Sequence, residues 1–302
     1  MSLSRRLAAG STRSVRAFTL VEMLVVLGII GILVALLLPA VMAAVRNARN
    51  ASIALEIKNL DTALNTYKQQ RGEYPPSFGD YNTSGNLVYN ITMAGVPNRY
   101  NSKVEAHLLR CYTKLIDYPA NSMDNKDRFY IAAMEVDQAE ALVLWLSLTS
   151  TDPANPFEMN ATRHGYYEFD QRRLITNGDS DGIPIFVSRY TRDQPYMYVE
   201  NRNYVQFMQA NCAPKALTPD GTLQRCCPYG SSATTPMNPN TFQILCAGQD
   251  GDWGGLTTPS GNPSRYPAKV FPGDDNANYS AGDRDNLTNF SEGRTLGDAR
   301  PQ

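Results

Sequence analysis

Histidine is scarce in this sequence, which has only His107 and His164 among 302 residues. Neither lies near the cysteines at positions 212 to 246, no CxxC pair occurs and no HExxH motif is present, so the sequence does not predict a zinc site. A glycine-rich phosphate loop and a nucleophile elbow are also absent. These absences favour a protein that is not an enzyme.

An excess of charge of either sign is also lacking. The chain has 28 basic and 29 acidic residues, which gives a formal net charge of -1. Removal of the first 17 residues, which hold four arginines and no acid, would leave 24 basic against 29 acidic residues, a charge of -5. Nothing in this balance predicts a nucleic-acid partner.

Charge is missing altogether from Met23 to Val45, a run of 23 residues. A helix rises about 1.5 Å per residue, so this run spans roughly the 30 Å hydrocarbon core of a bilayer. We therefore predict a transmembrane helix at about residues 20–45. The basic segment before it favours an N-terminus in the cytoplasm and a head on the other side of the membrane. That segment carries Arg5, Arg6, Arg13 and Arg16.

One acid, Glu22, lies at the start of the apolar run. A carboxylate inside a membrane costs about 2.5 to 3.5 kcal/mol on insertion scales, so it requires a partner or a function. Three interpretations of the N-terminus compete: a cleaved secretory signal, a plain signal anchor, and a leader that is cut before a retained helix. A secretory signal has a shorter apolar core of about 7 to 15 residues, and a plain anchor gives no reason for the acid.

The third interpretation is supported by a resemblance. The sequence AFTLVE at residues 17–22, followed by an apolar helix, resembles the type IV pilin and type II secretion pseudopilin family. The resemblance implies that prepilin peptidase cuts between Ala17 and Phe18 and that the new amine of Phe18 is methylated. It further implies that Glu22 neutralises this amine in its own chain or, as the family is thought to do, in the next subunit of a filament.

Two further positions bear on the resemblance. The family strongly prefers Gly before the cut, whereas this chain has Ala17, which predicts slower cleavage. Pro39 matches a proline that the family associates with loosening of the helix during assembly. A proline within a helix also removes a backbone donor and kinks it, so an ordinary transmembrane kink is the alternative.

Beyond the membrane, apolar residues recur at spacings of four and three, which predicts that the helix continues with one apolar stripe. The stripe consists of Ile53, Ile57, Leu60, Leu64 and Tyr67. Gly72, Pro75 and Pro76 predict a helix end at about Arg71. The predicted organisation is a leader at 1–17, a long helix at 18–72 and a head at 73–302. The expected fold class is α+β and pilin-like, with the helix packed on an antiparallel sheet.

Within the head we predict helices at about 102–117 and 137–148, the second capped by Asp137. Residues 183–190 and 195–204 are rich in β-branched and aromatic residues, and TRDQ between them suggests a hairpin. We expect loops at 77–99 and 206–240. The sequence TFQILCAGQDGDWGG, with a strand at 241–247, is similar to the last strand and turn of pseudopilin heads.

Disulfides and calcium are the remaining candidates in the head. Outside the cytoplasm disulfides can form, and the sequence predicts at least one bridge, most simply from Cys212 to Cys226 or Cys227. Acidic turns offer candidate calcium ligands at Asp179, Asp181, Asp250 and Asp252, and solvated turns are the alternative. We expect no other cofactor. The candidate disulfide residues are Cys212, Cys226, Cys227 and Cys246.

The expected function is that of a structural subunit of a type II secretion pseudopilus or a type IV pilus-like filament. Its expected location is the bacterial inner membrane, with a single pass and a periplasmic head, followed by the filament. The resemblance implies prepilin peptidase, other subunits, the inner-membrane assembly platform and membrane lipid as partners. The assembly residues would be Phe18, Glu22 and Pro39. A minor or adhesive pilin with a ligand-binding head and a membrane-anchored enzyme are the alternatives.

Overall fold

The structure is a computed structural model. It describes residues 18–78, 102–112, 136–152, 154, 156, 162–163, 165–176, 182–191, 194–202, 204, 215–217, 223–225, 227–232, 235–254, 269–271 and 279–299. The chain divides into two compact units, Met1–Asn47 and Ala48–Gln302. Residues 48–71 of the predicted helical segment therefore belong to the same unit as the head. The predicted leader at 1–17 and the loop expected at 77–99, from residue 79 on, lie outside the described residues.

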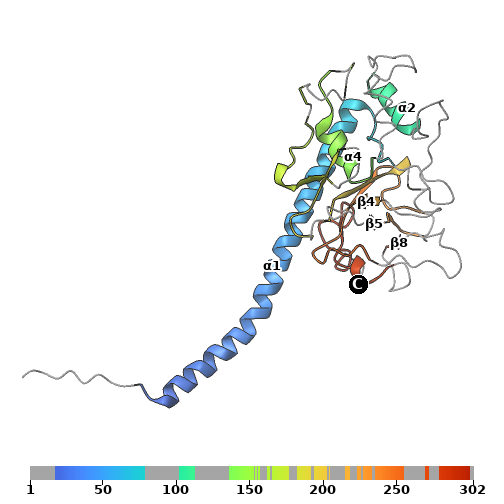
Figure 1. The fold of residues 1–302 in the computed structure, drawn as a ribbon. Coiled ribbons are helices and arrows are strands. Elements are labelled where there is room, and N and C mark those ends of the chain that lie inside the picture. Colours follow the sequence, from blue (N-terminus) through green and yellow to red (C-terminus); the bar gives the residue numbers. More distant parts are fainter. Residues whose placement is uncertain are drawn as a thin grey trace, which may run out of the picture. The chain divides into compact units, whose positions relative to one another are not determined.

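Helix α1 runs from Leu20–Arg71 without interruption, and Pro39 lies inside it (Figure 1). A proline has no backbone N–H, so the carbonyl of Ala35 lacks its usual helical partner there. The helix ends where Gly72 takes a positive φ of 88°, a conformation that favours glycine, and its N–H donates to the carbonyl of Lys68. The predicted helix end at about Arg71 is confirmed.

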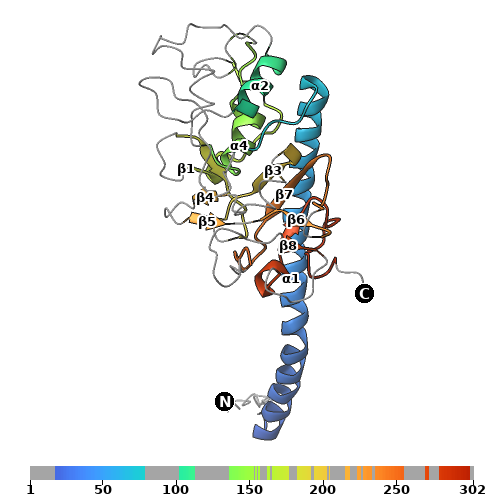
Figure 2. The same cartoon turned by 90° about the vertical axis from the view of Figure 1, so that its right-hand side faces the viewer.

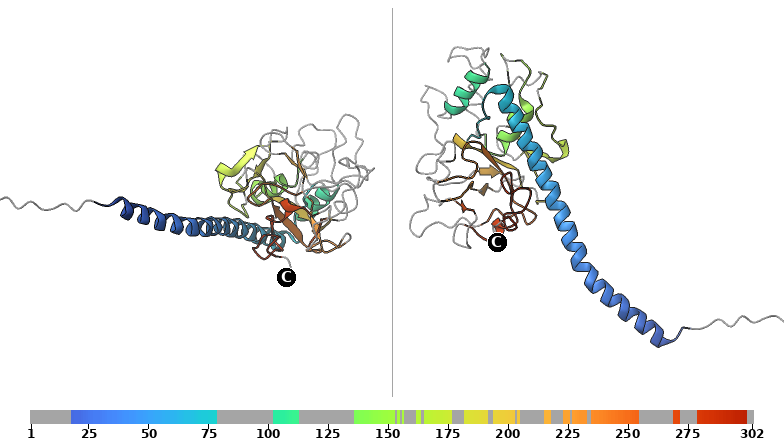
Figure 3. Two further views of the ribbon diagram at one scale, coloured as in Figure 1. Left: turned by 90° about the horizontal axis from the view of Figure 1, so that it is seen from below. Right: turned by 180° about the vertical axis from the view of Figure 1, so that it is seen from behind.

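The second half of α1 buries the predicted stripe. Ile53, Leu60 and Tyr67 are among its buried side chains, and they share one hydrophobic core with residues of the strands. Figure 3 shows this half of the helix running alongside the C-terminal strands. The strand residues of this core include Tyr198, Phe242, Ile244 and Leu287, and Tyr196 lies just before β3. The apolar stripe therefore packs against the head, as its spacing predicts.

A three-stranded antiparallel sheet faces this helix, in the order β3-β7-β9. Its strands are β3 (Met197–Glu200), β7 (Phe242–Cys246) and β9 (Leu287–Thr288), and Tyr198 is paired with Ile244 across β3 and β7. Tyr198 also donates from its hydroxyl to the carbonyl of Pro75, 2.7 Å away, just after α1 ends. Figure 2 shows β3 and β7 beside the helix. The predicted α+β, pilin-like fold with a strand at 241–247 is confirmed.

The hairpin predicted across TRDQ is present but short. The backbone N–H groups of Ser188 and Tyr196 donate to the carbonyls of Gln194 and Phe186, both at 3.0 Å. Strand β2 (Pro184–Phe186) pairs with β1 (Leu174–Thr176), which follows the short 3-10 helix η2 (Gln171–Arg173), whereas β3 pairs with β7. An isolated bridge from Val187 to Pro195 joins the two predicted strands. Beyond this short hairpin the chain continues as β3, which pairs with β7, and Tyr198 of β3 packs into the core with α1.

The region expected as a loop at 206–240 contains strands. Among its described residues, β4 (Lys215–Leu217) pairs with β5 (Leu223–Arg225), and β6 (Tyr229–Gly230) pairs with β8 (Lys269–Val270) in parallel. A further 3-10 helix, η3 (Ala281–Asp283), precedes β9. The run from residue 206 to 240 lacks the periodic apolar pattern that marks longer strands, which is why sequence alone did not predict these elements.

Two short helical segments complete the head. Helix α2 (Ser102–Cys111) matches the start of the first predicted helix, whose residues from 113 on are not described. Helix α4 (Glu140–Val143) continues into the π-helix η1 (Leu144–Leu148). Asp137 Oδ1 accepts from the backbone N–H of Ala139 and of Glu140, and Glu140 accepts in return from the N–H of Asp137. Asp137 thus caps this segment, as predicted.

Candidate functional site

The start of α1 is closed by a reciprocal pair of hydrogen bonds. Glu22 Oε2 accepts from the backbone N–H of Thr19 at 2.9 Å and from its hydroxyl at 2.8 Å, and the Thr19 hydroxyl accepts from the N–H of Glu22 at 3.2 Å. This arrangement is a capping box, which satisfies two helical N–H groups that otherwise have no partner. The spacing Thr-x-x-Glu in the sequence is the signal for this cap, which the charge of Glu22 alone does not indicate.

The first half of α1 is exposed, and no described residue of its own unit covers it. Helix α1 contains a stretch that is long and apolar enough to cross a membrane, and no residue of that stretch is buried. Large apolar side chains point outward all around it, and Phe18 is 75% exposed. Added Cβ atoms at Gly28 and Gly31 would meet no atom within 4 Å, so both positions leave room for another helix. Such a surface is stable only against lipid or against other apolar chains.

A family model described as the prokaryotic N-terminal methylation motif matches residues 12–38. The chain carries the type IV pilin and pseudopilin signature. This pilin-like signature marks it as a prepilin peptidase substrate and, with the apolar helix, as membrane-anchored. Comparison with curated proteins finds no match, and comparison with solved structures finds none either. The match spans Ala17, Phe18 and Glu22, the predicted processing and assembly residues, and ends one residue before Pro39.

The second predicted acidic turn, at Asp250 and Asp252, meets the segment before β9. Asp285 Oδ2 accepts from the backbone N–H groups of Gln249 and Asp250 at 2.8 and 3.1 Å. Burial and the charge of Asp250 raise the pKa of Asp285 to about 6. Backbone N–H groups of Asp252 and Gly254 donate to the carboxylates of Asp250 and Asp252. The turn therefore concentrates negative charge, much of it bound to backbone amides.

A buried lysine neutralises part of this charge. Lys269 Nζ donates to Asp283 Oδ1, the same oxygen that accepts from the Tyr229 hydroxyl, and both Lys269 and Asp283 are almost fully buried. Among the described residues, these acids do not bring three ligand atoms within 4.8 Å of one another. Calcium at Asp250 and Asp252 stays a prediction, and the other predicted pair, Asp179 and Asp181, lies outside the described residues.

The described cysteines are buried or half-buried. Cys246, one of the disulfide candidates, is a free thiol fully buried in β7, where its side chain packs into the core, so the structure does not include it in a bridge. Cys227 is buried as well. Cys212 and Cys226 lie outside the described residues, so the bridge from Cys212 to Cys226 or Cys227 stays a prediction.

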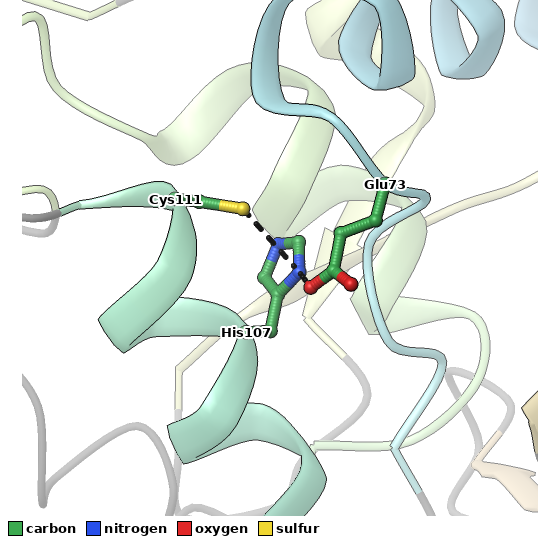
Figure 4. Close-up of side chains that lie close together, drawn as sticks. All are labelled: Glu73, His107 and Cys111. Atoms are coloured by element: carbon green, nitrogen blue, oxygen red, sulfur yellow. Dashed lines mark hydrogen bonds and ion pairs between the residues drawn. The ribbon is translucent and has the colours of Figure 1, made fainter.

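A cluster that the sequence reasoning missed joins the end of α1 to α2 (Figure 4). His107 Nδ1 lies 2.6 Å from Glu73 Oε1 and 3.6 Å from Cys111 Sγ, and His107 Nε2 lies 2.8 Å from the Tyr67 hydroxyl. His107 and Cys111 are four residues apart and therefore share one face of α2. This spacing on a predicted helix is the signal in the sequence for the pair His107 and Cys111. The cysteines at 212–246 offer no such spacing to a histidine.

Burial sets the protonation of this cluster. It lowers the pKa of His107, although the hydrogen bond to Glu73 opposes this, and it raises the pKa of Cys111 to about 11. Burial alone would raise the pKa of Glu73, but His107, Arg202 and Arg110 hold it below its ordinary value. Because a carboxylate only accepts, Nδ1 of a neutral His107 donates to Glu73 and Nε2 accepts from Tyr67.

The geometry of this cluster differs from that of a catalytic triad. In a triad the nucleophile and the orienting carboxylate lie on opposite nitrogens of the imidazole. Here Cys111 and Glu73 both approach Nδ1, and Tyr67 occupies Nε2. A thiol whose pKa is raised is also a poor nucleophile at neutral pH. The arrangement therefore lacks the means to activate Cys111 through His107.

Proposed function

We propose that this chain is a structural, non-enzymatic subunit of a filament, most similar in role to a type II secretion pseudopilin. The observation that carries the proposal is the first half of α1, an apolar helix with a single acid at its start whose side chains are exposed among the described residues of its unit. Membrane lipid covers this surface before assembly, and the helices of other subunits cover it afterwards. The head is then displayed outside the filament core.

Processing creates the charge that Glu22 recognises. Cleavage after Ala17 leaves an α-amine on Phe18, and such an amine titrates at about 7.7 to 8.0, so much of it is positive at pH 7. Glu22 in one subunit pairs with this amine in the next, because the apolar helix offers either charge little other compensation. Pro39 loosens the helix as the subunit leaves the membrane for the filament.

Topology and partners follow from the same segment. The arginines of residues 1–17 hold the N-terminus in the cytoplasm, which places the head in the periplasm after a single pass. Prepilin peptidase removes the leader at the inner membrane, and an inner-membrane assembly platform adds the subunit to the filament. No nucleic-acid partner is part of this proposal.

Cleavage is tested by the mass of the mature protein. Replacing Ala17 by a bulky residue, as in Ala17→Trp, should block the peptidase and leave a precursor that is 17 residues longer. The parent chain should begin at Phe18 with a methylated amine. A mature N-terminus at any other residue would contradict the processing step.

The role of the Glu22 charge is tested by two matched variants. Glu22→Gln keeps the capping box, since Gln serves at this position, but removes the charge; Thr19→Val removes the capping hydroxyl and keeps the charge. The proposal expects Glu22→Gln to be cleaved and inserted yet to form few filaments, and Thr19→Val to assemble. The reverse result would mean that Glu22 acts only as a helix cap.

The type II secretion role is tested separately, in the source bacterium. Deleting the gene should stop release of secreted proteins into the medium and leave surface pili intact. The parent gene should restore release, whereas the gene for Glu22→Gln should not. Loss of surface pili with normal secretion would instead assign the chain to a type IV pilus-like filament.

A further inference from the structure

We propose that Glu73, His107 and Cys111 form a binding site for a zinc ion in the head. This site lies outside the N-terminal methylation motif and is independent of filament assembly. The three side chains offer a carboxylate oxygen, an imidazole nitrogen and a sulfur, and these are the ligand atoms that Zn²⁺ takes in proteins.

The three ligand atoms converge from two segments. Glu73 follows the end of α1, whereas His107 and Cys111 lie one turn apart on α2. All three atoms lie within 4.8 Å of one another, and among the described residues this is the group of His, Cys and acidic side chains that meets this condition. Figure 4 shows the imidazole ring of His107 between the thiol of Cys111 and the carboxylate of Glu73, with dashed lines that join the ring to both groups. A metal ion bound by all three would replace the 2.6 Å hydrogen bond between Nδ1 and Glu73, and the two ligand atoms would separate to about 3.3 Å, the spacing of neighbouring ligands in a tetrahedral site.

Neighbouring groups hold these ligands in place. The His107 ring is stacked on Tyr67, edge-on to Trp145 at 5.1 Å between centroids, and its Nε2 faces the Tyr67 hydroxyl. Metal-bound histidines commonly donate from the other ring nitrogen to such a partner, which fixes the ring orientation. The site therefore has an outer shell as well as ligands.

Glu73 is oriented by charge. Its second oxygen, Oε2, lies 3.0 Å from Arg110 and 3.5 Å from Arg202, which leaves Oε1 directed at His107. Arg71 also reaches the site and contacts the carbonyl of Cys111. The positive charges of Arg71, Arg110 and Arg202 repel a metal ion, but they also stabilise the thiolate of Cys111 that the ion requires. The balance favours a metal that binds sulfur and nitrogen strongly, such as Zn²⁺, over Ca²⁺ or Mg²⁺, which prefer oxygen.

Binding has a defined proton balance. The thiol of Cys111 loses its proton to solvent as sulfur binds the ion. The neutral ring of His107 moves its proton from Nδ1 to Nε2, where the Tyr67 hydroxyl turns to accept it. One proton is therefore released for each ion, and a water molecule completes a four-coordinate site.

The test uses the full chain in detergent, titrated with Zn²⁺ and, as a spectroscopic substitute, with Co²⁺. The parent should bind one Zn²⁺ per chain, and the Co²⁺ form should show a thiolate-to-cobalt charge-transfer band. Cys111→Ser should abolish the band, and His107→Gln should weaken Zn²⁺ affinity at least about tenfold. The matched controls are Cys246→Ser, which changes another buried free thiol, and His164→Gln, which changes the other histidine.

A second measurement needs no substitution. Zn²⁺ should slow alkylation of Cys111 in the parent chain, measured by peptide mass, without slowing alkylation of a cysteine outside the site to the same degree. The proposal is overturned if the parent binds no stoichiometric Zn²⁺, if Cys111 is not protected, or if the Co²⁺ band is lost in Cys246→Ser and kept in Cys111→Ser.

Discussion

Glu56 on α1 and Arg173 before β1 form a bidentate ion pair, with N–O distances of 2.6 and 2.7 Å. The Tyr196 hydroxyl donates to the same carboxylate, and the Arg173 guanidinium lies 4.3 Å from the centre of the Phe186 ring. Both charged side chains are largely buried. The pair therefore attaches the second half of α1 to three segments of the head.

Replacing Arg173 by Met should destabilise the head strongly. Loss of the guanidinium leaves Glu56 buried without a cationic partner. Removing one member of a buried ion pair costs about 3 to 5 kcal/mol, and we expect the lower end of this range here because both side chains keep some exposure to water. Arg172→Met is the matched control, because Arg172 is exposed, and its melting temperature should hardly change. Urea unfolding of both variants provides the measurement. Equal loss in the two variants would refute a specific role for Arg173.

The turn at residues 248–254 should become less stable as pH rises. The pKa of Asp285 is about 6 in the folded chain and about 3.9 in the unfolded chain. The favourable contribution of protonated Asp285 to the free energy of unfolding is therefore complete below about pH 4 and is lost as pH rises through about 6. Asp285→Asn keeps an oxygen for the backbone donors and removes the titration. Its melting temperature between pH 5 and 7 should therefore vary less than that of the parent, whereas Glu292→Gln on the surface should follow the parent.

The acidic segment before β9 should depend on Lys269. Lys269→Met removes the cation from buried Asp283 and should cost about 3 kcal/mol, because an unpaired buried charge remains. Lys58→Met, an exposed position on α1, is the control. Addition of Ca²⁺ to the parent tests the calcium prediction at Asp250 and Asp252, and an unchanged melting temperature would contradict it. A clear rise with Ca²⁺ that Asp252→Asn abolishes would instead support calcium at this turn.

The cysteines should differ in reactivity. Cys246 should be alkylated only after denaturation, because it is fully buried and burial raises the pKa of its thiol to about 12.

Non-reduced peptides of protein from the native compartment should show a bridge from Cys212 to Cys226 or Cys227. Free thiols at all five cysteines would contradict the predicted bridge and weaken the case for export of the head.

The long helix and its apolar stripe can be predicted from the sequence. Charge is absent from Met23 to Val45, and the stripe from Ile53 to Tyr67 repeats with helical spacing. The helix end at Gly72 and the cap at Asp137 are likewise written in a few adjacent residues. All of these are local properties, because helical hydrogen bonds and side-chain periodicity join residues only three or four positions apart.

The strand pairing and the side-chain clusters in the head depend on contacts between residues that are far apart in the sequence. Beyond the bridge from Val187 to Pro195, β2 pairs with β1 and β3 pairs with β7, and Cys246 is placed in the core instead of in a bridge. Glu73 meets His107 across 34 residues of sequence, and Glu56 meets Arg173 across 117. Such partners are selected by which apolar faces are buried together, and the free energy of that burial depends on the whole chain rather than on any short stretch of it.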